Sequence, residues 1–360
     1  MPRVNHSNNS FEDMFPLPNF LEVPAIGVDI TDGSVKYLEI VRHRKHFKVG
    51  RYGEKKLPAG CVIDGQIKDK RALVSVLASL KKEGILFANV SLPEEKAFLF
   101  KVTVPNADDS EIRANLSYQL ETKVPVALSS AVFDYDLLKN SHKGSQVEAV
   151  VTVLPTDFVV SYLAAFKESG IQPLSFEIEG QAISRAVVPR NCRESVMVVD
   201  FGHKRTGLSV VSCGVVVYTS TVDFGGDVIS QKIKEIMKVT DAEITRIKNE
   251  NGIGEKSPPE LKEALTLPLG GLKDEINKHY NYWKTRVDEG KESPIEKIII
   301  CGGNSNIAGF KEYLSASMNV KVERGNVWQR LWNLDDYIPP IKEELSFGYA
   351  TAIGLASANL

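Results

Sequence analysis

One stretch in the middle of the sequence has the residue types and the spacing of an anion-binding turn. Val196–Val199 is an unbroken apolar run, typical of a strand that is covered on both faces, and it ends at Asp200. Gly202 then allows a tight turn that brings backbone N–H groups close to an anion, and Thr206 adds a hydroxyl on its far side. Further on, Gly225 and Gly226 open a predicted helix whose first N–H groups face outward. The pattern predicts two anion-binding turns beside a carboxylate.

The start of the sequence repeats this pattern. The apolar run Ala25–Ile30 has Asp29 near its end, and Gly33 and Ser34 turn the chain into a returning strand. Ser34 and Lys36 are residues that can bind phosphate, because a hydroxyl donates a hydrogen bond and an ammonium supplies a mobile positive charge. The alternative for Lys36 is an ordinary lysine that faces outward from its strand.

A third glycine turn, Gly302 and Gly303, closes the apolar run that begins at Ile298 and leads into a predicted helix, Ile307–Ser317. The pair offers a surface without side chains, on which an adenine ring can lie flat, and it also makes a tight strand-to-helix turn. A single Asp-x-Gly after an apolar strand is usually only a turn in an ordinary sheet. Three such turns, in this order and over nearly the whole chain, resemble the sugar-kinase, chaperone and actin superfamily.

Longer segments narrow the resemblance to one family, PilM, the actin-like cytoplasmic ATPases of type IV pilus assembly. The segments that resemble it are IGVDITDGSVKYLEI, NLSYQLETKVPVALSSAVFDYDLL, SFEIEGQAISRAV, DFGGDVISQKI and SFGYATAIGLA. The resemblance runs from about Ala25 to Ala358 and is most specific after Pro105. It implies an α/β fold of two actin-like (ribonuclease-H-like) lobes with an inserted α+β subdomain, as in FtsA and PilM. FtsA, the cell-division relative, usually ends in a membrane-targeting amphipathic helix, and nothing in this sequence resembles that tail.

The predicted domains follow from this resemblance and from the positions of the turns. A leader, expected to be flexible, covers 1–24, although Phe15 and Phe20 leave a short docking motif open there. The first lobe is predicted at 25–188, with the inserted subdomain at about 105–154. The second lobe is predicted at 189–360, with a helical subdomain at about 228–290 in which prolines separate several helices. The Gly- and Ala-rich end, Phe347–Ala358, is expected to pack on the second lobe.

Composition excludes several classes of protein. The chain has 360 residues, enough for two lobes, and a net charge of −2 with the two signs mixed, so no basic field indicates nucleic acid. Its 4 cysteines show no C-x-x-C pair and no metal spacing, which favours a reducing compartment. No apolar stretch is long enough to span a bilayer.

The resemblance implies ATP with Mg²⁺ between the lobes, with the metal held largely through water by Asp29 and Asp200. Glu179 lies where the superfamily often orients the attacking water, and Glu177 lies two residues earlier on the same predicted strand face. Glu179 and Asp200 are therefore the candidate catalytic residues, with a solvated or helix-capping role as the alternative for Glu179. Lys248 lies where relatives contact the ribose or the adenine.

Two residues depart from the family pattern. Thr31 stands where relatives usually have glycine, and a β-branched residue tolerates a left-handed turn badly. Glu243 is five residues before Lys248, which turns it off a shared helix face. Both departures favour an alternative in which the chain is a nucleotide-binding scaffold with negligible hydrolysis, and at most a slow ATPase is expected.

The resemblance also implies partners and a location. These are the N-terminal cytoplasmic peptide of a PilN-like membrane protein, other proteins of the assembly platform, the assembly ATPases and further copies of the chain. The expected location is the cytoplasm, peripheral to the inner membrane, with the membrane reached only through the partner. An FtsA-like division protein, a small-molecule kinase of the superfamily and a type II secretion platform protein stay open as alternatives.

Overall fold

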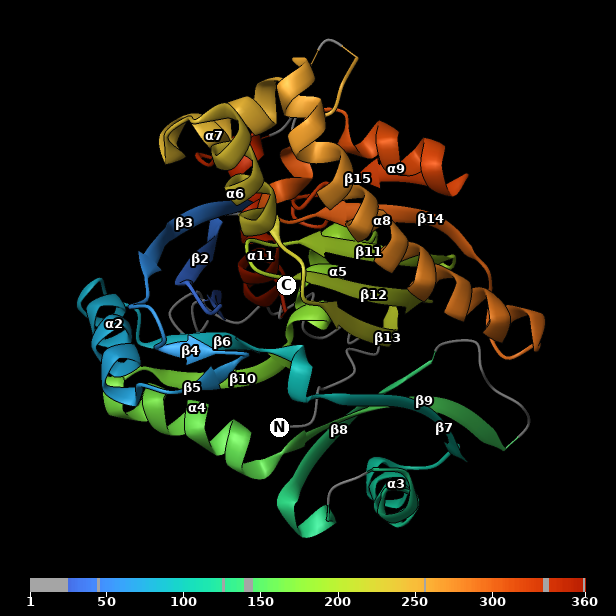
Figure 1. Cartoon of the computed structure of the whole chain (residues 1–360). Helices are drawn as coiled ribbons and strands as arrows, with labels where there is room; N and C mark the ends of the chain where they lie inside the picture. The colour runs from blue at the N-terminus through green and yellow to red at the C-terminus, as the bar shows by residue number, and fades with distance from the viewer. Residues whose placement is uncertain are drawn as a thin grey trace.

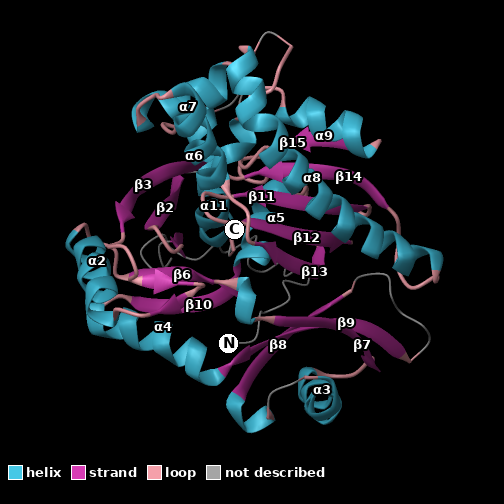
Figure 2. Cartoon of the chain, in the orientation of Figure 1, coloured by secondary structure: helices cyan, strands magenta, loops and turns pink. Residues whose placement is uncertain are grey.

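The computed structural model describes residues 25–43, 46–124, 127–138, 145–255, 257–332, 337–358 and 360. The predicted leader at 1–24 lies outside the described residues. Two five-stranded sheets form the centres of two lobes, and a smaller three-stranded sheet stands beside them (Figure 1). Helices cover the sheets and lie between them (Figure 2). This architecture confirms the predicted α/β class with an inserted α+β subdomain.

The first lobe is built on the sheet with strand order β10-β6-β1-β2-β3. Its strands are β1 (Ala25–Ile30), β2 (Ser34–His43), β3 (His46–Lys56), β6 (Phe87–Leu92) and β10 (Gln172–Ile178). β1 pairs with β2 antiparallel and with β6 parallel, so the carboxyl ends of β1 and β6 meet at one edge. The helices α2 (Lys70–Lys82) and α4 (Thr156–Ser169) contact each other and share one apolar core with this sheet. A small hairpin, β4 (Val62–Ile63) and β5 (Gln66–Ile67), lies near them.

The second lobe repeats the hairpin arrangement of the first on the sheet with strand order β13-β12-β11-β14-β15. Its strands are β11 (Ser195–Phe201), β12 (Thr206–Ser212), β13 (Val215–Val222), β14 (Ile295–Cys301) and β15 (Lys321–Arg324). β11 pairs antiparallel with β12 and parallel with β14, as β1 does with β2 and β6. Its helices are α6 (Gly226–Met237), α7 (Asp241–Glu250), α8 (Pro259–Asp288) and α9 (Phe310–Met318).

The helices of the second lobe differ from the prediction in two places. The break expected at Pro258 and Pro259 is present, because α8 begins at Pro259, but the break expected from Pro268 to Gly271 is absent: α8 continues for 30 residues with Pro268 inside it. Proline removes a helical hydrogen bond, but Pro268 lies on the buried face with Leu265 and Leu269, and their packing keeps the helix continuous. The helix expected from residue 307 is preceded by a 3₁₀ turn, η3 (Gly303–Asn306), and begins only at Phe310.

Two helices cross the space between the large sheets. α5 (Glu179–Val187) and α11 (Ala350–Ala356) contact each other, and α11 also contacts β1, β2 and β6 of the first lobe. The chain reaches α11 through α10 (Glu343–Ser346) and the 3₁₀ turn η4 (Phe347–Tyr349). This end packs on the second lobe, as predicted, because Phe347 and Ile353 share a core with Val196 of β11. It also packs on the first sheet, which was not predicted: a Cβ on Gly27 of β1 would lie 2.0 Å from the Ala352 carbonyl oxygen.

The inserted subdomain consists of a three-stranded antiparallel sheet and one helix. Its elements are β7 (Phe98–Pro105), α3 (Asp109–Lys123), the 3₁₀ turn η2 (Leu128–Ser130), β8 (Ala131–Leu137) and β9 (Gln146–Pro155), in strand order β7-β9-β8. Asp108 caps α3, as predicted, by accepting the N–H of Glu111. α3 closes one face of the sheet, while Leu138 and Val150 join the core of the second lobe. The subdomain thus contacts the second lobe although it is inserted in the first.

Among the described residues, no helix combines the length and the apolar composition that crossing a membrane requires.

Candidate functional site

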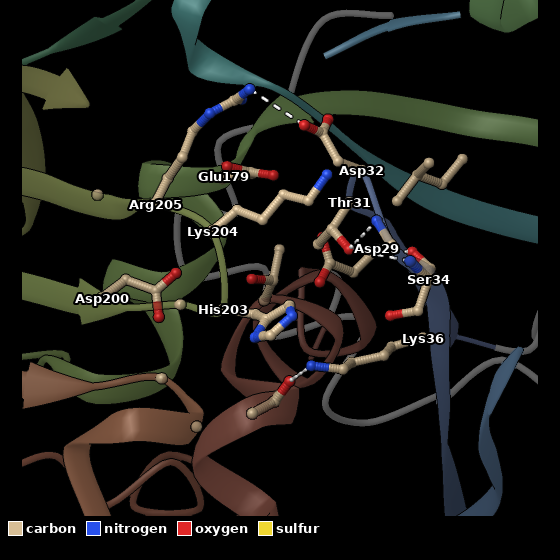
Figure 3. A pocket seen from close by; sticks show the side chains of 18 of the residues that line it. Asp29, Thr31, Asp32, Ser34, Lys36, Glu179, Asp200, His203, Lys204 and Arg205 are labelled. Carbon is tan, nitrogen blue, oxygen red and sulfur yellow. Dashed lines mark hydrogen bonds and ion pairs between the residues drawn. The ribbon is translucent and has the colours of Figure 1, made fainter. Parts of the chain in front are cut away.

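A cavity of about 570 Å³ lies between the two lobes, where the turns after β1 and β11 face each other. Figure 3 shows side chains from both lobes that point into it. Of the residues selected from the sequence, the lining includes Asp29, Gly33, Ser34, Lys36, Glu179, Asp200, Gly202, Gly302 and Gly303. The two hairpins and the third glycine turn, far apart in the sequence, therefore meet at one site, and its volume is that of a small-molecule pocket.

Asp29 and Asp200 occupy equivalent positions at the ends of the two first strands. Asp29 is buried and accepts a hydrogen bond of 2.8 Å from Ser91 Oγ, while Asp200 lies within 3.9 Å of Cys301 Sγ. Burial raises the pKa of Asp29, and Lys36 and Ser91 oppose the rise. Burial, with the charge of Asp29 added, raises the pKa of Asp200 to about 6. Two carboxylates that repel each other in a shared cavity gain from a cation between them.

Glu179 begins α5 and faces the same cavity. Burial and then the nearby carboxylate of Asp29 raise its pKa well above the ordinary value. The neighbouring candidate, Glu177, is engaged elsewhere, because it forms an ion pair with Arg185. The structure thus separates the two glutamates, which the sequence left on one strand face.

Two further acidic residues, Glu94 and Glu95, line the cavity and were not selected from the sequence. They form the 3₁₀ turn η1 (Glu94–Lys96), directly after β6. Burial, and then the charges of Glu95 and Asp200, raise the pKa of Glu94 to about 8. Both side chains have an Oε2 atom that is buried without a partner in the described part of the chain. The signal that could have found them is their place at the carboxyl end of a strand parallel to β1.

The first turn satisfies its own backbone. Thr31 N–H donates to the Ser34 carbonyl oxygen at 2.9 Å, and Thr31 Oγ1 accepts the N–H groups of Gly33 at 3.4 Å and of Ser34 at 3.2 Å. Lys36, expected at the phosphates, donates instead to the carbonyl oxygen of Gly348 at 2.8 Å (Figure 3). The donors that the sequence assigned to the first turn are thus largely in use within the protein.

The second turn carries basic side chains over the cavity. Arg205 forms ion pairs with Asp32, Asp64 and Glu95, which belong to three separate segments of the first lobe. Lys204 extends into the cavity on the side of the first turn (Figure 3). Within the described ranges it has no hydrogen bond or ion pair. The turn therefore links the lobes through Arg205 and leaves the Lys204 ammonium available.

Four of the residues selected from the sequence are not part of the cavity lining: Thr206, Gly225, Gly226 and Lys248. Thr206 is fully buried and donates to the Phe224 carbonyl oxygen at 2.7 Å, and Gly226 N–H donates to the Gly202 carbonyl oxygen at 3.1 Å. The helix N-terminus that was expected to face an anion thus supports the second turn from behind.

Lys248 is also buried, and burial lowers its pKa to about 8. Its ammonium donates to Asn304 Oδ1 at 2.8 Å, and Asn304 in turn donates to the Gly202 carbonyl oxygen at 2.7 Å. Asn304 lines the cavity and was not selected from the sequence. Lys248 therefore acts on the site through Asn304, while Glu243 only caps its own helix by accepting the N–H of Thr240.

The residues present fit a nucleotide and a hard metal ion. Added Cβ atoms on Gly33 and Gly303 would meet nothing within 4 Å, so bare backbone faces open space at both turns. All the acidic groups offer oxygen, the ligand that Mg²⁺ prefers. Among the described residues, however, no three His, Cys, Asp or Glu side chains are grouped closely enough to bind a metal directly. Asp29 and Asp200 would accordingly hold Mg²⁺ through water molecules.

The family model of the type IV pilus assembly protein PilM matches residues 27–359. This chain belongs to the PilM family. The match extends from β1 to the end of α11, so it includes both hairpins and the inserted subdomain, and it confirms the family that the sequence segments indicated.

Solved structures share the fold at low identity. The structure described as a PilM-PilN type IV pilus biogenesis complex is 18% identical, covers 93% of this chain and 98% of that chain, and has a TM-score of 0.75. EutJ, an ethanolamine utilization protein from Carboxydothermus hydrogenoformans, is 15% identical over 95% and 90%, with a TM-score of 0.52. MreB5 of Spiroplasma citri bound to AMPPNP is 11% identical over 92% and 94%, with a TM-score of 0.53. The two-lobed actin-like fold is thus confirmed.

Proposed function

We propose that this chain binds ATP with Mg²⁺ between its lobes and serves type IV pilus assembly as a cytoplasmic protein that a PilN-like membrane protein recruits. The observation that carries the nucleotide proposal is the cavity of about 570 Å³ between the lobes, lined by Asp29 of the first hairpin and Asp200 of the second. Family membership supports the process, and the AMPPNP in the similar MreB5 structure supports the class of ligand.

We assign the following roles to the residues of the proposed nucleotide site. Asp29 and Asp200 hold the metal through water, which neutralises charge that burial makes costly. The Lys204 ammonium, which lines the cavity without a partner among the described residues, contacts the phosphates. Gly302 and Gly303 offer the base a surface without side chains. Glu179 orients a water for slow hydrolysis.

Thermal melting with Mg-ATP tests the nucleotide site. Ligand at 100 times its dissociation constant stabilises the native state by about 2.7 kcal/mol, so the wild type should melt at a higher temperature with Mg-ATP than without it. Asp200→Asn should lose this shift, because an amide does not organise the metal. Asp274→Asn, at an exposed position of α8, is the matched control and should keep it. Equal shifts in both variants would remove Asp200 from the site.

The partner proposal concerns the inserted subdomain. The similar complex pairs its PilM with PilN, and in this chain β8 is an edge strand of the small sheet, with Val132 exposed on it. An edge strand can accept an extended peptide through main-chain hydrogen bonds, with alternate side chains giving specificity. We therefore place the N-terminal peptide of the PilN-like protein along β8.

Fluorescence polarisation with that peptide tests the placement. Val132→Lys puts a charge on the edge and should weaken binding at least tenfold, since edge lysines oppose strand pairing. Tyr118→Lys, an exposed apolar position on α3 of the same subdomain, is the control and should bind normally. If both variants bind as the wild type does, the peptide lies elsewhere.

A further inference from the structure

A second, much smaller cavity adjoins the nucleotide cleft. Its volume is about 10 Å³, close to the least space that one water molecule needs. Its lining includes three carboxylates and a hydroxyl, from Glu94, Glu179, Asp200 and Ser209. Because the three carboxylates also line the large cavity, a water here would stand at the wall of the cleft with several polar partners.

Glu94 presents an unpaired oxygen to this space. Its side chain is only 6% exposed. Oε1 lies 3.5 Å from Thr221 Oγ1, but Oε2 has no hydrogen-bond partner within the described residues. A buried carboxylate oxygen without a partner is costly, so it implies a ligand that donates hydrogen bonds.

Two glycines make the room for this arrangement. A Cβ on Gly180 would lie 2.9 Å from Glu94 Oε2 and 2.6 Å from Ser209 Oγ. A Cβ on Gly207 would lie 3.3 Å from Glu94 Oε1. All three distances are below ordinary van der Waals contact, so any side chain at Gly180 or Gly207 would push against the Glu94 carboxylate or Ser209 Oγ.

We propose that Glu94 is a second catalytic carboxylate of this site and holds the attacking water together with Glu179. The inference rests on the proposed binding of ATP. The water oxygen forms a bond to the terminal phosphorus, the bond from that phosphorus to the bridging oxygen breaks, and ADP leaves with the electron pair. One proton of the water passes to whichever of the two carboxyl groups, Glu94 or Glu179, is ionised. The first lobe supplies Glu94 from η1, and Glu179 comes from the first turn of α5.

The experiment measures ATP affinity by calorimetry and single-turnover phosphate release on the same preparations. Glu94→Gln should slow release about 10- to 100-fold and leave the dissociation constant within about threefold, because it removes an interaction made with the attacking water. The pair Glu94→Gln and Glu179→Gln should be little slower than either single variant, since both act on one water. Glu94→Asp should retain part of the rate. Glu121→Gln, exposed on α3, controls for the loss of one charge.

Gly180→Ala provides a second test, because its Cβ enters the small cavity and crowds Glu94 Oε2 and Ser209 Oγ without removing a carboxylate. It should slow release to a similar extent and leave ATP bound. Wild-type release rates in Glu94→Gln would overturn the inference, and so would ATP binding by the wild type without any turnover above a protein-free control. Failure of the wild type to bind Mg-ATP would instead overturn the proposed function.

Discussion

The two hairpin turns follow the same sequence pattern and differ in what they leave available to a ligand. At the first turn, the Thr31 side chain accepts the N–H groups of Gly33 and Ser34. At the second turn, Gly202 N–H is used by the carbonyl oxygens of Asp200 and Arg205, yet Lys204 and Arg205 extend over the cavity. The Thr31 hydroxyl thus occupies two N–H groups of the first turn, whereas the second turn places the Lys204 ammonium, which has no partner among the described residues, in the cavity.

The largest expected effect is a change of the free energy of unfolding with pH, and it comes from a carboxylate close to the second hairpin. Glu94, which contacts the second hairpin at Thr221, has its pKa raised from 4.5 to about 8, first by burial. Between these values the folded state binds a proton that the unfolded state has lost, so the free energy of unfolding falls as the pH rises from about 4.5 to 8 and then levels off.

The fall due to Glu94 should be on the order of a few kcal/mol in the absence of metal, measured by urea unfolding at a series of pH values. Glu94→Gln removes the titrating group, so its curve should be flatter over the same range. An unchanged slope in the variant would mean that Glu94 ionises in the folded protein as it does in the unfolded chain.

The next largest expected effect is the difference in ATP affinity between variants of two lysines, Lys204 at the second turn and Lys36 after the first. Lys204→Ala should weaken ATP binding about 10- to 100-fold, because a hydrogen bond to a charged group contributes about 1.5–3 kcal/mol. Lys36→Ala should weaken it less than about threefold, since Lys36 already donates to Gly348. Calorimetry measures the dissociation constant of ATP for both variants. A larger loss of affinity in Lys36→Ala than in Lys204→Ala would contradict this prediction.

Arg205 should matter for stability more than for affinity. Its side chain is 18% exposed, and Arg205→Ala leaves Asp32 and Glu95 without their cation, so the free energy of unfolding should fall by about 1–3 kcal/mol. Arg113→Ala breaks more exposed ion pairs on α3 and should cost less than about 1 kcal/mol. Equal losses in urea unfolding would show that the contacts across the cleft contribute no more than surface pairs.

The smallest expected effect is the change in ATP affinity when Thr31 is replaced. Thr31→Gly frees the N–H groups of Gly33 and Ser34, so ATP should bind a few times more tightly, while the apo protein loses about 0.5–1 kcal/mol of stability from the added flexibility. Thr31→Val, which keeps the branched shape without the acceptor, separates the hydrogen bonds from the backbone restriction. Unchanged affinity in Thr31→Gly would show that phosphate does not use this turn.

Much of the fold could be predicted from sequence because the signals are local. The apolar runs before Asp29 and Asp200 and the cap at Asp108 depend only on neighbouring residues, and the strands and the helix lie where those residues indicate. α8 could not be predicted, because buried packing along a long face overrides the preference of Pro268 for a break.

Site residues at the ends of apolar strands could be predicted from the sequence. Residues whose role depends on the approach of distant segments could not. Glu94 stands among charged residues after Pro93 and looks like part of a solvated loop until β6 is placed beside β1. Arg205 acquires its partners only when three segments of the first lobe approach the second turn. Lys36 has the right type and position but is held by Gly348, from the far end of the sequence.

The placement of α11 has a consequence for the order in which the chain is completed during synthesis. The helix packs directly on β1, and the Asn89 side chain of β6 donates to the Leu355 carbonyl oxygen at 3.1 Å. The strands β1, β2 and β6 therefore lack one covering helix until α11 has been synthesised, and α11 shares a core with the second-lobe strands β11 and β14 as well. On the ribosome, the facing sides of both large sheets therefore become fully covered only after the last described helix has emerged.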